Sequence, residues 1–176
     1  DIKPIVAITA SWVDKNSQLT PFPEKFPEEA TILKEAALQE KITIANHGLT
    51  HCVIGQHMPL FRHSNRPFHR EFWPELGQEL HTKHILRSQE ILENWLEKPV
   101  TYFIPPGNVW SIKTYQVLRQ TNIKKVLANR YMIDSQEPME NIVFVDDRQN
   151  FVVWHDRDLK LKGSRWVKNQ LEELKI

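Results

Sequence analysis

The chain has 176 residues and a mass of 20.8 kDa, a size that suits one domain with a substantial core. Its 23 basic and 22 acidic side chains give a net charge of +1, which argues against a general binder of nucleic acid or of anionic membranes, since both need a basic excess. No apolar stretch approaches the roughly 18 residues that span a bilayer, and a lone cysteine, Cys52, excludes an internal disulfide.

The first half of the chain alternates strand and helix patterns. An apolar run over residues 5–13 predicts a buried strand. Pro27, followed by two glutamates, predicts a helix that runs to Glu40. A second strand is predicted over residues 41–46, and residues 52–74 follow as a long irregular stretch rich in His, Arg, Phe and Pro.

The second half continues this alternation. Its predicted helices cover residues 75–97, 111–121 (capped by Ser111) and the tail from Leu161. Its predicted strands cover residues 100–104, 125–128, 142–145 and 151–154. The pair Asp146–Asp147 between the last two strands is interpreted as a hairpin turn. Strands separated by helices predict an α/β fold with a largely parallel sheet or barrel, as a single domain over residues 1–176.

Two histidines four residues apart, His47 and His51, follow the second predicted strand. Neutral imidazole is the commonest protein ligand for zinc, and Gly48 permits the turn that lets both rings reach one ion. The alternative is a pair of hydrogen-bonded loop histidines. Cys52 comes directly after His51 but is interpreted as a small buried residue rather than as a thiolate ligand.

Three segments fall at predicted strand ends: the histidine pair, residues 105–108 (Pro-Pro-Gly-Asn) and residues 154–158 (Trp-His-Asp-Arg-Asp). Parallel strands bring their carboxyl ends to one edge, so we expect the three segments to meet in space. Each also has a plainer interpretation. The proline pair can be only a rigid turn, and His155 can be a strand-end histidine paired with Asp156 or Asp158.

In this order the motifs resemble the polysaccharide deacetylase superfamily, also called the NodB-homology domain or carbohydrate esterase family 4. Residues 47–51 (His-Gly-Leu-Thr-His) are similar to its His-x-x-x-His zinc motif. Residues 104–107 (Ile-Pro-Pro-Gly) are similar to its Arg-Pro-Pro-Tyr-Gly segment, and residues 154–156 to its late Leu-His-Asp motif. The resemblance implies an irregular seven-stranded (β/α) barrel.

The resemblance also implies a function, the metal-dependent removal of N-acetyl groups from amino sugars of a bacterial surface polysaccharide or its nucleotide-linked precursor. His47 and His51 would hold a divalent metal, most plausibly zinc, although cobalt and nickel stay open. His155 would protonate the leaving amine, and the N–H of Gly107 would face the developing oxyanion. Pro106 and Asn108 would then line the substrate site.

The sequence departs from the family pattern in two places. The first family motif, Thr-Phe-Asp-Asp-Gly, supplies the catalytic base and the third metal ligand, and we expect it on a strand before Asp1. A final strand is expected after residue 176, so the barrel is expected to be incomplete at both ends. The alternative is that this copy has lost its base. Asp14 is a substitute candidate for the carboxylate ligand. Ile104 replaces the motif's arginine, and Arg130 is a candidate for that role by position alone.

The stretch after the metal motif is interpreted as a substrate-binding segment, since aromatic faces suit sugar rings and guanidinium groups suit phosphate or carboxylate. Its candidate substrate contacts are Arg62, Arg66, His69 and Trp73. The alternative is a basic surface loop. Two further histidines, His81 and His84, are expected on the solvated side of the following helix.

Two rival functions remain open from the sequence: a catalytically inactive carbohydrate-binding relative of the same fold, and a C–N hydrolase of a small non-sugar amide. The expected partner is an amino-sugar polysaccharide or a nucleotide-linked sugar, with no nucleic acid and no membrane span. The oligomeric state and the compartment are not indicated, with a cytoplasmic location slightly favoured.

Overall fold

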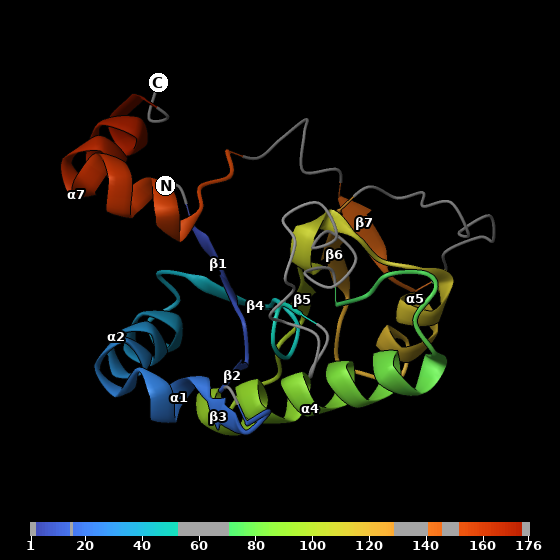
Figure 1. Ribbon diagram of the computed structural model, residues 1–176. Coiled ribbons are helices and arrows are strands. Elements are labelled where there is room, and N and C mark those ends of the chain that lie inside the picture. The colour runs from blue at the N-terminus through green and yellow to red at the C-terminus, as the bar shows by residue number, and fades with distance from the viewer. Residues whose placement is uncertain (1–2, 15, 53–70, 129–140, 146–151, 174–176) are drawn as a thin grey trace.

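The computed structural model describes residues 3–14, 16–52, 71–128, 141–145 and 152–173 (Figure 1). Its centre is one sheet of five parallel strands. In spatial order these are β1 (Ile5–Ile8), β4 (Thr43–Asn46), β5 (Tyr102–Phe103), β6 (Lys125–Leu127) and β7 (Val143–Val145). Strand order follows chain order, and the α/β class with a parallel sheet is confirmed. Within the described part of the chain, the sheet is open between β1 and β7.

The strand predicted over residues 5–13 is divided into two. After β1, the backbone N–H groups of Ala10 and Ser11 donate to the carbonyls of Gly48 and Leu49 at 3.0 and 2.7 Å, so the chain here pairs with the histidine loop instead of β4. It then forms a small antiparallel hairpin from β2 (Ser11–Val13) and β3 (Leu19–Pro21). The apolar pattern continues through this change of partner, and for that reason the sequence showed one strand.

The described helices are α1 (Phe22–Lys25), α2 (Pro27–Leu38), α4 (Gln78–Leu96), α5 (Ile112–Leu118) and α7 (Asp156–Glu173), with a 3₁₀ turn, η2 (Pro106–Asn108). Helices α2, α4 and α5 begin within a few residues of their predicted positions. Pro27 occupies the first turn of α2, where a missing N–H costs nothing. The predicted cap of α5 is confirmed: Ser111 and Thr114 form a capping box.

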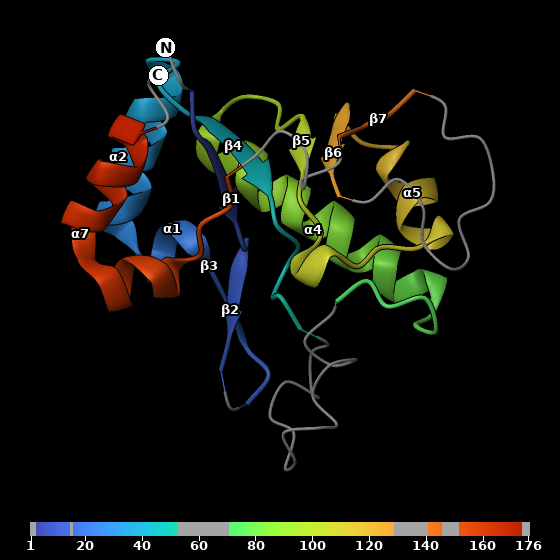
Figure 2. The same ribbon diagram turned by 90° about the horizontal axis from the view of Figure 1, so that it is seen from above.

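Helix α4 is the central packing element of the fold. Figure 2 shows it between α1 and α2 on one side and α5 on the other. Its Ile85 belongs to one buried cluster, with Phe72, Phe103 and Trp110, and its Leu92 belongs to a second cluster around β1 and β4. The same helix therefore ties the two halves of the core together.

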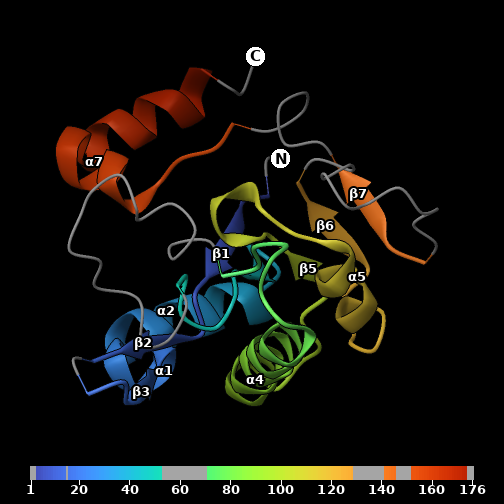
Figure 3. The same cartoon turned by 45° about the vertical axis from the view of Figure 1, so that its right-hand side comes forward.

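The C-terminal part of the chain is packed more loosely. Residues 152–154, predicted as strand, have no strand structure, and α7 begins at Asp156 rather than near Leu161. Figure 3 shows α7 on the opposite side of the sheet from α4. Leu161 is 81% exposed. No helix in the described ranges is long and apolar enough to cross a membrane.

Candidate functional site

The two histidines singled out in the sequence lie side by side in a tight loop after β4. Gly48 has φ +77° and His51 has φ +59°, and these two left-handed residues turn the chain back on itself. The imidazole ring centroids of His47 and His51 are 5.1 Å apart with an interplanar angle of 64°. The loop thus brings two nitrogen ligands together, as the spacing predicted.

The tautomer of His47 follows from its hydrogen bond. Its Nδ1 lies 2.6 Å from the carbonyl oxygen of Ile104, and because a carbonyl only accepts, Nδ1 carries the hydrogen. In the neutral ring the lone pair is then on Nε2. This is the arrangement found when a backbone carbonyl accepts from the other ring nitrogen and orients a metal-binding histidine.

The electrostatic surroundings of His47 keep it neutral. The pKa of His47 is lowered from 6.5 to about 4. Burial is the largest cause and the neighbouring His51 adds to it, whereas the hydrogen bond that His47 donates to the carbonyl of Ile104 acts in the opposite direction. A neutral imidazole is the form that ligates a metal. His47 is therefore neutral across the physiological pH range, as a metal ligand would need to be.

The segment after β5 packs directly on this loop. A Cβ at Gly48 would lie 3.0 Å from Cγ of Pro106, so the two segments are in contact. Pro106 is buried, whereas Gly107 and Asn108 are exposed, both with left-handed backbones at φ +64° and +55°. Ile104, which stands where the resembled Arg-Pro-Pro-Tyr-Gly segment has arginine, contacts His47 through its backbone carbonyl. The structure thus brings two of the three predicted segments together.

His155 approaches the pair from the start of α7. Its side chain is 61% exposed, and its Nδ1 lies 3.8 Å from Oδ2 of Asp158. The backbone N–H of His155 donates to the same carboxylate oxygen at 3.0 Å, while its carbonyl accepts from the N–H of Asp158. His155 is also close enough for its charge to lower the pKa of His47. The third segment thus reaches the same region with fewer contacts.

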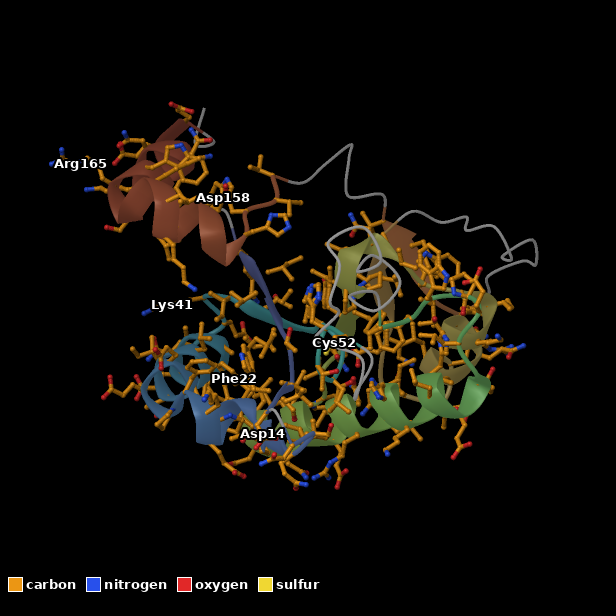
Figure 4. All side chains as sticks on the ribbon, in the orientation of Figure 1. Asp14, Phe22, Lys41, Cys52, Asp158 and Arg165 are labelled. Atoms are coloured by element: carbon orange, nitrogen blue, oxygen red, sulfur yellow. The ribbon has the colours of Figure 1, made fainter. Side chains whose placement is uncertain are left out.

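Asp14 is not brought to the histidines. It lies exposed in the β2–β3 turn, where its Oδ1 accepts from the N–H groups of Asn16 and Gln18, both at 2.8 Å. Figure 4 shows it well away from Cys52, which directly follows His51. Asp14 serves the hairpin turn, so we leave it out of the site.

Several other predicted residues lie outside the described residues: Arg62, Arg66, His69, Arg130, Asp146 and Asp147. Trp73 is described and partly buried, and its carbonyl accepts from Nε2 of His81 at 3.2 Å. Cys52 is buried as expected, and burial raises the pKa of its thiol. The uncharged thiol supports the interpretation of Cys52 as a packing residue.

The expectation that His81 and His84 face solvent is wrong. Both are buried, at 0% and 2% exposure, and each has hydrogen-bonded partners. Nδ1 of His81 lies 3.0 Å from the hydroxyl of Thr114, and His84 contacts Glu71. Polar residues on a helix usually mark its solvated face, but here the buried face of α4 is partly polar and its groups are paired.

Glu71 was not predicted from the sequence, and the structure places it in the centre of the site. Its carboxylate is fully buried. It accepts from the backbone N–H groups of Leu49 at 2.8 Å and His51 at 3.1 Å. Its position next to Phe72, in an otherwise irregular stretch, carries no local pattern that marks it.

The donor set fits a borderline divalent cation such as zinc only in part. Two imidazoles converge, and the one with a defined tautomer has its Nε2 available, which is the chemistry that such a cation requires. Within the described ranges, no group of three or more His, Cys, Asp or Glu side chains could hold a metal. His47 and His51 could therefore supply two ligands of a metal site, which is fewer than a complete set.

Comparisons with known proteins support the family for the part of the chain that holds the first two motifs. The sequence model of the family described as polysaccharide deacetylase matches residues 1–126. A search of curated proteins finds no match.

Among solved structures, the fold is similar to a CE4 family pseudoenzyme from Bacillus anthracis, with 12% identity, a TM-score of 0.39 and coverage of 70% of this chain and 41% of that one. A family 4 acetyl xylan esterase from Clostridium thermocellum, in complex with a cobalt ion, has 10% identity, a TM-score of 0.45 and coverage of 86% and 67%. A family 4 carbohydrate esterase from Streptomyces lividans, in complex with acetate, has 16% identity, a TM-score of 0.40 and coverage of 79% of this chain and 71% of that one. The chain thus spans less than half of the Bacillus protein.

Proposed function

Because this chain belongs to the polysaccharide deacetylase family, we propose that it takes part in the hydrolysis of N-acetyl groups on amino sugars, in a bacterial surface polysaccharide or its nucleotide-linked precursor. The observation that carries the proposal is the paired His47 and His51, with His47 held neutral and its Nδ1 bound to the carbonyl of Ile104.

In the proposed site, Nε2 of His47 and the ring of His51 hold a divalent metal, for which zinc is our first choice. Such an ion, when bound, polarises the amide carbonyl and lowers the pKa of water. The family's motif assigns the base to a carboxylate. The carboxylate of Glu71 is fully buried and bound to the amides of the histidine loop, and Asp14 is bound to its own turn, so neither is assigned this role.

The remaining roles follow the placement of the other residues. His155 donates a proton to the amine as the C–N bond breaks, and water supplies the hydroxyl that leaves with acetate. Gly107 is exposed, and its N–H donates to the carbonyl oxygen as the negative charge there grows. Exposed Asn108 and the neighbouring Pro106 border the sugar, and Trp73, with the segment that includes Arg62, Arg66 and His69, remains a proposed substrate contact.

The test measures zinc uptake and acetate release with the full-length protein. We expect wild-type protein to bind about one zinc, and His47→Gln and His51→Gln each to bind it at least about 100-fold more weakly, since each removes one ligand. His155→Gln is the matched control: it should keep its zinc and lose acetate release from N-acetylated glucosamine oligosaccharides. Wild-type protein without metal uptake, or uptake unaffected by both substitutions, would refute the proposal.

A second candidate is a carbohydrate-binding relative without turnover. The donor set favours it, because the described residues contain no group of three or more side chains that could hold a metal, and the carboxylate of Glu71 is bound to the amides of the histidine loop. Calorimetric binding of the same oligosaccharides with no acetate released, measured on the full-length protein loaded with zinc, would favour this candidate over the first.

A further inference from the structure

The histidine loop presents an unusual row of backbone donors. Each of the four consecutive N–H groups from residue 48 to residue 51 donates to a buried side-chain oxygen. Successive N–H groups that point the same way form a concave nest, which in many proteins binds an anion from solution. Here the nest is filled from within the chain.

The group that fills most of the nest is the carboxylate of Glu71. Its Oε1 accepts from Leu49 at 2.8 Å and from Thr50 at 3.3 Å, and its Oε2 accepts from His51 at 3.1 Å. The fit is tight, because a Cβ at Gly48 would lie 2.2 Å from Oε2. Glycine at position 48 therefore allows the carboxylate to approach the loop.

We propose that Glu71 is a positioning residue of the metal site: it fixes the backbone of the histidine loop so that His47 and His51 face each other before any metal binds. The part of this inference that is tested by zinc affinity rests on the proposed function. Glu71 itself has no access to substrate, since it is fully buried and its oxygens are occupied by the loop.

Helix α4 holds Glu71 in place from behind. Nδ1 of His84 lies 2.5 Å from Oε1 of Glu71, and because a carboxylate only accepts, the imidazole donates. His84 is 2% exposed and on the core-facing side of α4. The loop, the carboxylate and the helix thus form one hydrogen-bonded chain.

A separate contact anchors the start of the loop. The N–H of Gly48 donates to Oδ1 of Asn46 at 2.9 Å, while Nδ2 of Asn46 donates to Ser88 at 2.9 Å and to Gln89 at 3.0 Å. This contact reaches α4 without Glu71. It therefore provides an internal reference, since loss of Glu71 should free residues 49–51 and leave the amide of Gly48 protected.

The test compares Glu71→Gln with Glu79→Gln, a substitution of an exposed glutamate on α4. In metal-free protein, NMR hydrogen exchange of the amides of Leu49, Thr50 and His51 should become about 10-fold faster or more in Glu71→Gln. Its zinc affinity should fall by about 10- to 100-fold, the usual effect of losing an outer-shell partner. Glu79→Gln should match wild type in both measurements, and the thermal midpoint reports any global loss of structure.

His84→Asn provides a second variant if Glu71→Gln does not fold. It removes the support of the carboxylate and keeps the carboxylate itself, so it should change both measurements in the same direction and by less. Exchange rates and zinc affinity equal to those of wild type, in whichever of these variants folds, would overturn the inference. If wild-type protein binds no zinc, the proposed function fails, and the exchange rates alone decide whether Glu71 holds the loop.

Discussion

The two histidine-bearing parts of the site differ in how firmly they are held. His47 is partly buried, bonded to Ile104, and part of a loop whose amides are bound by Asn46 and Glu71. His155 is 61% exposed and stands at the start of α7, with its described contacts made to Asp158. Under the proposed function, the side that would hold the metal is thus preorganised, and the side that would donate the proton is not.

This difference indicates a division of roles. Metal ligands act best when their geometry is fixed before binding, because distortion on binding weakens affinity. A proton donor to a leaving group needs reach and contact with solvent. The comparison therefore predicts that substitutions on the loop side affect stability and metal affinity, whereas substitutions near α7 affect turnover alone.

The largest difference should appear in stability. Phe72 is fully buried against Phe103, so the substitution Phe72→Ala should lower the free energy of unfolding by about 3–5 kcal/mol. Leu161 is 81% exposed on α7, so the substitution Leu161→Ala should change the free energy of unfolding by less than about 0.5 kcal/mol. Urea denaturation of both variants measures this, and equal losses would mean that α7 is packed as tightly as the core.

Acidification should weaken the loop side through His47. Its folded-state pKa of about 4 lies below the usual value of 6.5, so between these pH values the unfolded chain binds more protons than the folded one. In metal-free protein, unfolding free energy should therefore fall as the pH drops through this window, by up to about 3 kcal/mol from this residue. His47→Gln should lack this component. A pH-independent gap between the two stability curves would contradict the assignment.

The smallest expected effect concerns the start of α7. Asp158→Asn weakens the acceptor for the N–H of His155 and should cost less than about 1 kcal/mol of stability, because the contact is largely exposed. The turnover number should fall by about 10-fold, part of the roughly 10²- to 10⁴-fold contribution of a positioned acid. Zinc affinity should stay at the wild-type value. A loss of zinc affinity in this variant would show that His155 and the loop are not independent.

The sequence predicted those features that depend on local patterns. The apolar run before His47, the proline at the start of α2 and the cap at Ser111 each specify an element within a few residues, and the structure contains all three. The predicted meeting of His47 with the segment around Pro106 is also confirmed, because parallel strands dictate it.

Most of the features that the sequence did not predict depend on contacts between distant segments, and one, at Asp14, depends on a local turn. Glu71 is far along the chain from the loop that it binds, and nothing in its neighbours distinguishes it from an exposed acid. His84 was assigned to solvent because a histidine on a helix is polar, yet its burial is balanced by Glu71. Asp14 had a plausible position after a strand, but it caps its own turn.

The packing of α4 has one more consequence. Its apolar residues join both core clusters, and its polar residues His84, Ser88 and Gln89 support the histidine loop from the same helix. On heating, the arrangement of His47 and His51 and the packing of the core should therefore be lost in a single cooperative transition. The protein should have no temperature at which it stays folded with its histidines out of place.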